Sequence, residues 1–152
     1  MAVARGAWAL VPLRLVVGFG FAAHGYAKLA RGPENFAAIL QAIGIPAPGL
    51  AAWSTSLLEL VGGISLMLGA YVLPLSVPLS LVMVTALFGV HFRYGFSSIR
   101  LQAFGASGAV FGPVGYELNL LYVAALMVLA LSGPSPVSVD CWLISRRKGE
   151  QS

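Results

Sequence analysis

The sequence contains few charged residues. Asp, Glu, Lys and Arg make up 9% of its 152 residues, whereas an ordinary soluble domain has roughly 25%. The stretch from Asn35 to Phe92 contains only one of these four residue types, Glu59. A stretch this long and this apolar does not suit the core of a soluble domain, and it predicts segments that cross a lipid bilayer.

Cysteine is also scarce, because Cys141 is the single one. An intramolecular disulfide and a CxxC redox pair are therefore excluded. The sequence has no HExxH motif, phosphate-binding glycine loop or nucleophile elbow. The net charge is +4, but its basic residues are scattered apart from a short run near the C-terminus. We therefore expect neither a metal site, nor a nucleotide site, nor a nucleic-acid partner.

Four apolar segments approach the length, about 20 residues, that a helix needs to cross the hydrocarbon core. Gly133-Pro134 ends the last of them. These features predict one all-α domain over residues 1–152, a transmembrane four-helix bundle in the lipid bilayer. The four predicted crossings are residues 8–29, 50–71, 73–92 and 116–131.

An even number of crossings places both termini on the same side of the membrane. Arg5 and the run Arg146, Arg147 and Lys148, within a basic tail over residues 144–152, predict that this side is the cytoplasm. The connections between the first and second crossings and between the third and fourth would then lie outside.

Both outer connections have recognisable content. The first begins a short helix at Pro33, because Phe36, Ile39, Leu40 and Ile43 follow at helical spacing. This interfacial helix is expected to lie flat on the outer membrane surface. The second, residues 94–115, mixes glycine with large apolar side chains and is expected to cap the bundle.

Glu59 falls near the middle of the second crossing. A charged group there is costly unless it is paired, so it marks a candidate functional site. Arg14, inside the first crossing, is the expected partner, and an Arg14–Glu59 pair would suit a proton relay. The alternative is an ion pair that only fastens two helices together.

A second polar group gathers at the outer end of the predicted bundle. It consists of His24, Lys28, His91 and Glu117. Imidazoles, a cation and a carboxyl at one depth could bind a small anion or a quinone head group. The alternative is that these are ordinary interfacial side chains that extend to water.

At these residues the chain resembles the DoxX family of small membrane proteins. The resemblance implies a four-helix bundle in a bacterial inner membrane and an association with respiratory redox chemistry. Some relatives are subunits of thiosulfate:quinone oxidoreductases, and others are linked to oxidative stress or sulfur metabolism. The residues that carry the resemblance are Arg14-Leu15, Gly25, Lys28-Leu29, Leu58 to Gly63, Gly69, His91, Gly115-Tyr116-Glu117, Gly133-Pro134, Ser138 and Asp140.

The leading interpretation is therefore an integral membrane subunit of a quinone-linked redox complex, with a quinone as its expected ligand. The sequence shows no electron carrier, so an enzyme of this kind would need a partner subunit or a bound cofactor. One alternative is a non-enzymatic accessory or scaffold subunit of a larger membrane complex. Another is a small-solute or proton-coupled transporter, which four helices could form as a homo-oligomer.

Overall fold

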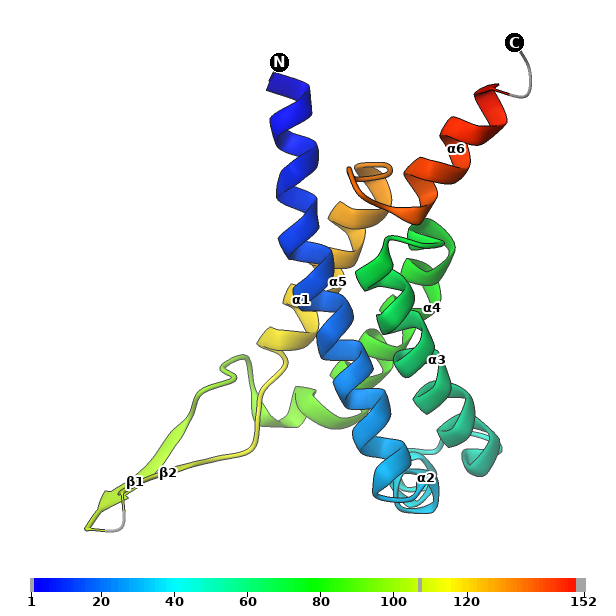
Figure 1. Cartoon of the computed structure of the whole chain (residues 1–152). Coiled ribbons are helices and arrows are strands. Elements are labelled where there is room, and N and C mark those ends of the chain that lie inside the picture. The colour runs from blue at the N-terminus through cyan, green and yellow to red at the C-terminus, as the bar shows by residue number, and fades with distance from the viewer. Residues whose placement is uncertain (1, 107, 150–152) are drawn as a thin grey trace.

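The computed structural model describes residues 2–106 and 108–149, and most of them are helical. Four longer helices are joined by shorter elements, and a two-stranded hairpin follows the third of them (Figure 1). In chain order the elements are α1 (Ala2–Ala30), α2 (Pro33–Ala42), α3 (Pro48–Leu68), α4 (Val72–Ala86), the π-helix η1 (Leu87–His91), the 3₁₀-helix η2 (Phe92–Tyr94), β1 (Leu101–Gly105), β2 (Gly108–Phe111), α5 (Glu117–Leu131) and α6 (Val139–Gly149).

Three helical segments of the described chain are long and apolar enough to cross a membrane. They are Gly6–Ala30, Pro48–Leu68 and Val72–Tyr94, and they coincide with the first three predicted crossings. The fourth predicted crossing forms α5, which is apolar but has only 15 residues. At 1.5 Å per residue α5 is about 22 Å long, shorter than a hydrocarbon core of roughly 30 Å.

The four longer helices pack around one another in a closed order: α1 on α3, α3 on α4, α4 on α5, and α5 on α1. Between them lies a core of aliphatic side chains together with Phe21, whose ring packs edge-on against Tyr122 at 5.2 Å between centroids. The start of α1 and the whole of α6 lie at one end of these helices, and α2 lies at the other (Figure 1). Both ends of the chain are therefore at the same end of the molecule.

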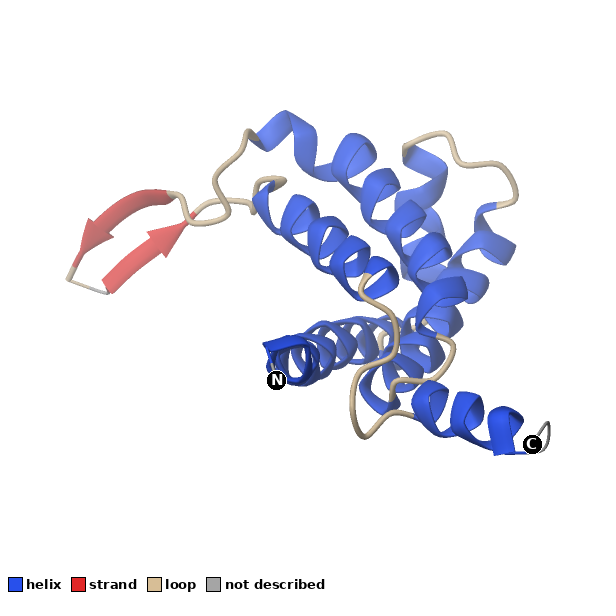
Figure 2. Cartoon of the chain, turned by 90° about the horizontal axis from the view of Figure 1, so that it is seen from above, coloured by secondary structure: helices blue, strands red, loops and turns tan. Residues whose placement is uncertain are grey.

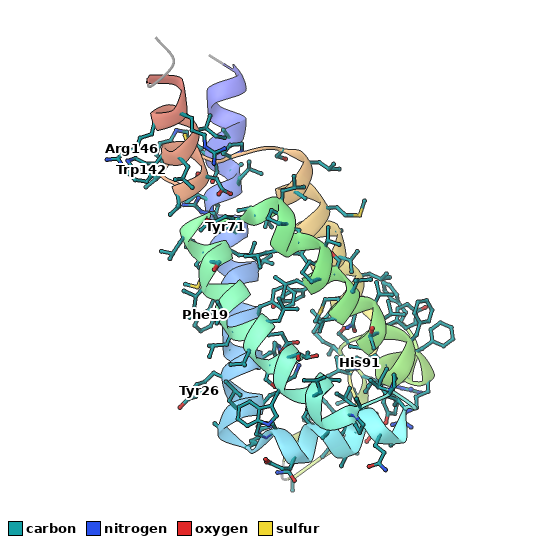
Figure 3. The ribbon with its side chains drawn as sticks, turned by 90° about the vertical axis from the view of Figure 1, so that its right-hand side faces the viewer. Phe19, Tyr26, Tyr71, His91, Trp142 and Arg146 are labelled. Carbon is teal, nitrogen blue, oxygen red and sulfur yellow. The ribbon has the colours of Figure 1, made fainter. Side chains whose placement is uncertain are left out.

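The predicted short helix after the first crossing is present as α2. It lies across the end of α1 and α3, and its Leu40 is buried (Figure 3). Ile43, just beyond its last residue, packs on the π-helix: a Cβ on Gly89 would lie 2.8 Å from Ile43 Cδ1. The apolar stripe of α2 therefore faces the bundle and covers one end of it.

The prediction that residues 94–115 cap the bundle was wrong. They form a hairpin that projects sideways, away from the helices (Figures 1 and 2). The cause lies at its base, where the two chain segments bond to each other: the amides of Gly115 and Tyr116 donate to the carbonyls of Ser97 and Gly95. These bonds fix the direction in which the hairpin leaves the bundle. The large apolar side chains of its strands, Leu101, Phe104 and Phe111, are exposed.

The predicted basic tail over residues 144–152 begins inside the helix α6. Residues 150–152 lie outside the described part. Asp140 fastens the start of α6 to the bundle, because its carboxylate accepts the backbone amides of Tyr71 (2.8 Å) and Val72 (3.1 Å) at the beginning of α4. Arg146 stacks over the ring of Trp142 on this helix (Figure 3).

Glycines allow α1 and α3 to approach very closely. A Cβ on Gly18 would lie 2.6 Å from the carbonyl oxygen of Gly63, and a Cβ on Gly25 would lie 2.7 Å from that of Ser56. Real Cβ atoms do not come this near to backbone, so both positions depend on the missing side chain. The small residues Gly62 and Gly63 of α3 therefore face the bundle and are buried.

This crossing gives a first prediction. Gly63→Ala should lower the free energy of unfolding by about 1–3 kcal/mol, because the new methyl group forces the two backbones apart. The control is Gly49→Ala, which meets nothing within 4 Å and should not destabilise the protein. Denaturant titration in detergent measures both, and equal stability of the two variants would contradict the close crossing.

The seating of α2 gives a second prediction. A Cβ on Gly89 would lie 3.7 Å from the Cβ of Ile43, within the range of about 3.5–4.5 Å found in disulfides. In a Cys141→Ser background, the pair Ile43→Cys and Gly89→Cys should therefore cross-link under mild oxidation. Loss of maleimide-reactive thiols, followed by mass spectrometry, measures the bond. The control pairs Gly89→Cys with Ile39→Cys one turn away, and equal cross-linking of the two pairs would contradict this placement of α2.

Candidate functional site

Glu59 is the buried carboxylate from which the site is built. It lies on α3 with 1% of its side chain exposed, and its Oε2 accepts a hydrogen bond from Lys28 Nζ at 2.6 Å. Lys28 is in the last turn of α1 and also lies over the ring of Phe36 on α2, 4.3 Å from its centroid. One ammonium group therefore links α1, α2 and α3.

The structure does not bring Arg14 and Glu59 together, so the predicted pair was wrong. Arg14 donates from Nη1 to Ser135 Oγ (2.7 Å) and from Nη2 to the carbonyl of Val137 (2.6 Å), in the segment before α6.

The register of the two helices explains this. Because Gly18 packs against Gly63, Arg14 lies one turn farther toward the start of α1, beside Gly69 at the end of α3. Gly69 is ten residues from Glu59, or about 15 Å of helix. The same register brings Lys28, on the opposite side of Gly18 along α1, to Glu59. Both cations can be read from the sequence, but the register of α1 on α3 cannot.

A cavity of about 900 Å³ lies beside the Lys28–Glu59 pair. Residues of α1, α2, α3, α4, η1 and α5 line it, with α2 covering one side. Most of its wall is apolar, contributed by side chains such as Phe36, Ile39 and Leu118. A volume of this size and a wall of this kind suit a small organic ligand. The polar side chains on the wall are His24, Lys28, Asn35, Thr55, Glu59, Thr85, His91 and Asn119, together with the phenol of Tyr122 and the guanidinium of Arg31.

His91 occupies the last position of the π-helix, at the α2 end of the bundle (Figure 3). Its Nδ1 lies 2.9 Å from the backbone carbonyl of Val114. A carbonyl oxygen can only accept, so Nδ1 carries the hydrogen, and in the neutral ring Nε2 is left as an acceptor. The π-helix and the base of the hairpin together hold this imidazole in place on the cavity wall.

Three of the four residues predicted to form the outer group line the cavity, and Glu117 does not. His24, Lys28 and His91 are on its wall, together with Glu59. The Glu117 carboxylate instead accepts the backbone amide of Ser98 at 3.0 Å, at the base of the hairpin. Glu117 is in the first turn of α5, and its side chain turns back toward the preceding loop rather than into the bundle.

The sequence reasoning missed Asn119 on α5. It is 6% exposed, donates from Nδ2 to the carbonyl of Met83 at 3.3 Å, and lines the cavity. A signal was present, because Asn119 is a polar side chain near the start of an otherwise apolar crossing. Thr55 on α3 is also on the cavity wall.

The arrangement offers both hydrogen-bond donors and acceptors on an otherwise apolar wall. The ammonium of Lys28 has three N–H groups, of which one is used by Glu59. His91 Nε2 can accept. Among residues 2–106 and 108–149, no group of three or more His, Cys, Asp or Glu side chains could hold a metal ion. The chemistry of the cavity is therefore hydrogen bonding to an amphipathic molecule, with a proton acceptor nearby.

The ion pair gives a third prediction. Lys28→Met should lower the free energy of unfolding by about 3–5 kcal/mol, because it leaves the Glu59 carboxylate buried without a partner. Adding Glu59→Gln should recover most of the loss, since the double variant buries no charge. The control is Arg31→Met, which removes an exposed cation one turn away. Denaturant titration in detergent measures all of these variants. If the double variant were less stable than Lys28→Met, the pairing would be contradicted.

Comparison with known proteins identifies one family. The family model DoxX matches residues 9–92, more than half of the chain, from α1 to the end of the π-helix. The matched region includes Lys28, Glu59 and His91, and also the close crossing of α1 and α3. A search of curated proteins and a search of solved structures each found no match. On the evidence of the family match and its apolar helices, the chain belongs to the DoxX family of membrane proteins.

Proposed function

We propose that this protein is an integral membrane subunit of a quinone-linked redox complex, and that its cavity binds a quinone head group. The observation that carries the proposal is the cavity itself. It combines a mostly apolar wall with Lys28, Glu59 and His91 on the same surface. A quinone is a flat apolar ring with two carbonyl oxygens, and it becomes a donor of two hydroxyl protons when it is reduced.

Each polar group has a role in this proposal. Lys28 donates a hydrogen bond to a quinone carbonyl with an N–H that Glu59 does not use. Glu59 holds the ammonium in place and balances its charge. His91 accepts a hydrogen bond from a quinol hydroxyl through Nε2, because Nδ1 is held by Val114. Quinone reduction takes up two electrons and two protons, and the electrons come from a partner subunit or its cofactor.

Arg14 has no part in this chemistry. Its bonds to Ser135 and Val137 place it near the opposite end of α1, where it fastens the segment between α5 and α6. The proton relay that the sequence suggested for Arg14 and Glu59 is therefore assigned to the cavity group of Glu59, Lys28 and His91.

The membrane placement belongs to the same proposal. We place α5 as the fourth crossing, because it packs along α4 and α1 and its 15 residues are almost entirely apolar. A crossing this short is accommodated by local thinning of the bilayer. The bundle then sits in a bacterial inner membrane with both termini in the cytoplasm, and with α2 and the cavity near the outer surface. Membrane partners pack against its lipid-facing helices.

The test is binding of decylubiquinone, a short-chain quinone, to the protein in lipid nanodiscs free of endogenous quinone. Glu59→Gln and His91→Phe should each weaken binding by about tenfold, because the first removes the charge that holds the Lys28 ammonium in place and the second removes the acceptor Nε2. The matched control is Glu34→Gln, which changes an exposed carboxyl of α2 outside the cavity and should bind as the wild type does.

The outcomes separate this proposal from its two alternatives. Equilibrium dialysis measures binding, and size-exclusion chromatography shows that each variant remains folded. Wild-type protein that binds no quinone, but purifies with a stoichiometric membrane partner, would overturn the proposal in favour of an accessory subunit. Solute flux into proteoliposomes that Glu59→Gln abolishes, without quinone binding, would favour a transporter instead.

A further inference from the structure

We propose that the hairpin β1–β2 is a lateral membrane anchor, which lies on the lipid beside the bundle with one face against the bilayer. This function goes beyond the proposed quinone site and does not depend on it. Of residues 97–115, the described cavity lining includes only Val114, at the base of the hairpin. We therefore infer the function of the hairpin from the residues that it exposes.

The register of the two strands gives the hairpin one strongly apolar face. Leu101 pairs with Phe111 and Phe104 with Ala109, while a bulge separates Leu101 from Ala103. Residues 109 and 111 of β2 point to the same side, so their partners on β1 do as well. This face, which we call the aromatic face, comprises Leu101, Phe104, Ala109 and Phe111. The opposite face carries the smaller pair Ala103 and Val110.

Nothing in the described part of the chain covers the aromatic face. Phe104 is 81% exposed, and Leu101 and Phe111 are each 58% exposed. An isolated two-stranded hairpin is at best marginally stable in water and needs a surface against which to bury an apolar face. The hairpin therefore requires an environment outside the bundle.

The position of the hairpin points to lipid as that environment. It leaves the bundle at the end where α2 lies, and it extends sideways rather than over the helices (Figures 1 and 2). A structure that projects laterally at the end of membrane-crossing helices lies at the level of the bilayer surface. The surface of η1 and η2 leads up to it through exposed aromatic side chains: Phe88 is 68% and Phe92 is 57% exposed.

Aromatic rings gather at the base of the hairpin. Phe92 stacks on Tyr116 at 5.6 Å between centroids, and Phe96 meets the same ring edge-on at 5.6 Å. Tyr116 is of the type enriched in the aromatic belts at the membrane–water interface, and the two Phe rings extend such a belt. The aromatic face continues this belt outward, onto lipid that the bundle does not cover.

The charge of the segment agrees with a lipid surface. Between Ser97 and Val114 the only charged residue is Arg100. An arginine beside an apolar face suits a phospholipid, whose phosphate lies just above the acyl chains. Phe104 would then contact the acyl chains, and Arg100 the phosphate groups, of the same bilayer surface.

The experiment measures the environment of the hairpin turn directly. In a Cys141→Ser background, Ala106→Cys in the turn is labelled with an environment-sensitive fluorophore. The full chain is reconstituted into vesicles of phosphatidylethanolamine and phosphatidylglycerol. Quenching by a doxyl-labelled phosphatidylcholine reports contact with lipid, and quenching by iodide reports exposure to water. We expect strong lipid quenching and weak iodide quenching.

Two adjacent substitutions then test the aromatic face. Phe104→Asp should abolish lipid quenching and increase iodide quenching, because it places a charge on the face that meets the bilayer. Ala103→Asp adds the same charge to the opposite face and should leave both signals unchanged. Equal effects of the two variants would overturn the assignment of the aromatic face.

The labelled protein without a further substitution provides the second test of the membrane anchor. A turn that iodide quenches and lipid does not would overturn the membrane anchor, and would indicate that the aromatic face is a docking site for a protein absent from the vesicles. Quinone binding can fail without affecting either fluorescence signal, so this test is independent of the proposed function.

Discussion

The close approach of α1 and α3 is the constraint on which the cavity depends. Gly18, Gly25 and Gly63 let the two backbones meet without side chains between them. Their contact sets the register of one helix on the other, and this register decides which cation reaches Glu59. Lys28 pairs with the carboxylate, whereas Arg14 is brought to the segment before α6. A change of one helical turn in this register would leave Glu59 buried and unpaired, which a membrane interior penalises heavily.

The pairing has consequences beyond charge balance. Lys28 donates to Glu59 on α3 and lies over the ring of Phe36 on α2. The same ammonium therefore helps to hold α2 over the end of the bundle, and α2 forms one side of the cavity. A ligand that hydrogen-bonds to a free N–H of Lys28 would contact a group that already stabilises the closed arrangement. Binding in the cavity and the seating of α2 are thus coupled through one side chain.

How much of this could be predicted from the sequence depends on the range of the interaction. Glu59 was identifiable because one carboxyl in a long apolar stretch is exceptional, and α2 followed from the local spacing of Phe36, Ile39 and Leu40. The partner of Glu59 was not identifiable, since it depends on contacts between residues far apart in the chain. The prediction that residues 94–115 cap the bundle failed for a related reason. Their apolar side chains suggest burial, but only the bonds at the base of the hairpin show in which direction it leaves the bundle.

The base of the hairpin connects the cavity to the hairpin. Val114 follows the hairpin, and its carbonyl accepts from His91 Nδ1. The Glu117 carboxylate accepts the amide of Ser98, in the loop that precedes the hairpin. The orientation of a cavity imidazole is therefore set by the same short segment that directs the hairpin. If the aromatic face rests on lipid, the bilayer surface restrains this segment as well. A membrane protein with few charged residues can position a hydrogen-bonding group in this way, by fixing the backbone beside it at the interface rather than by adding further buried polar side chains.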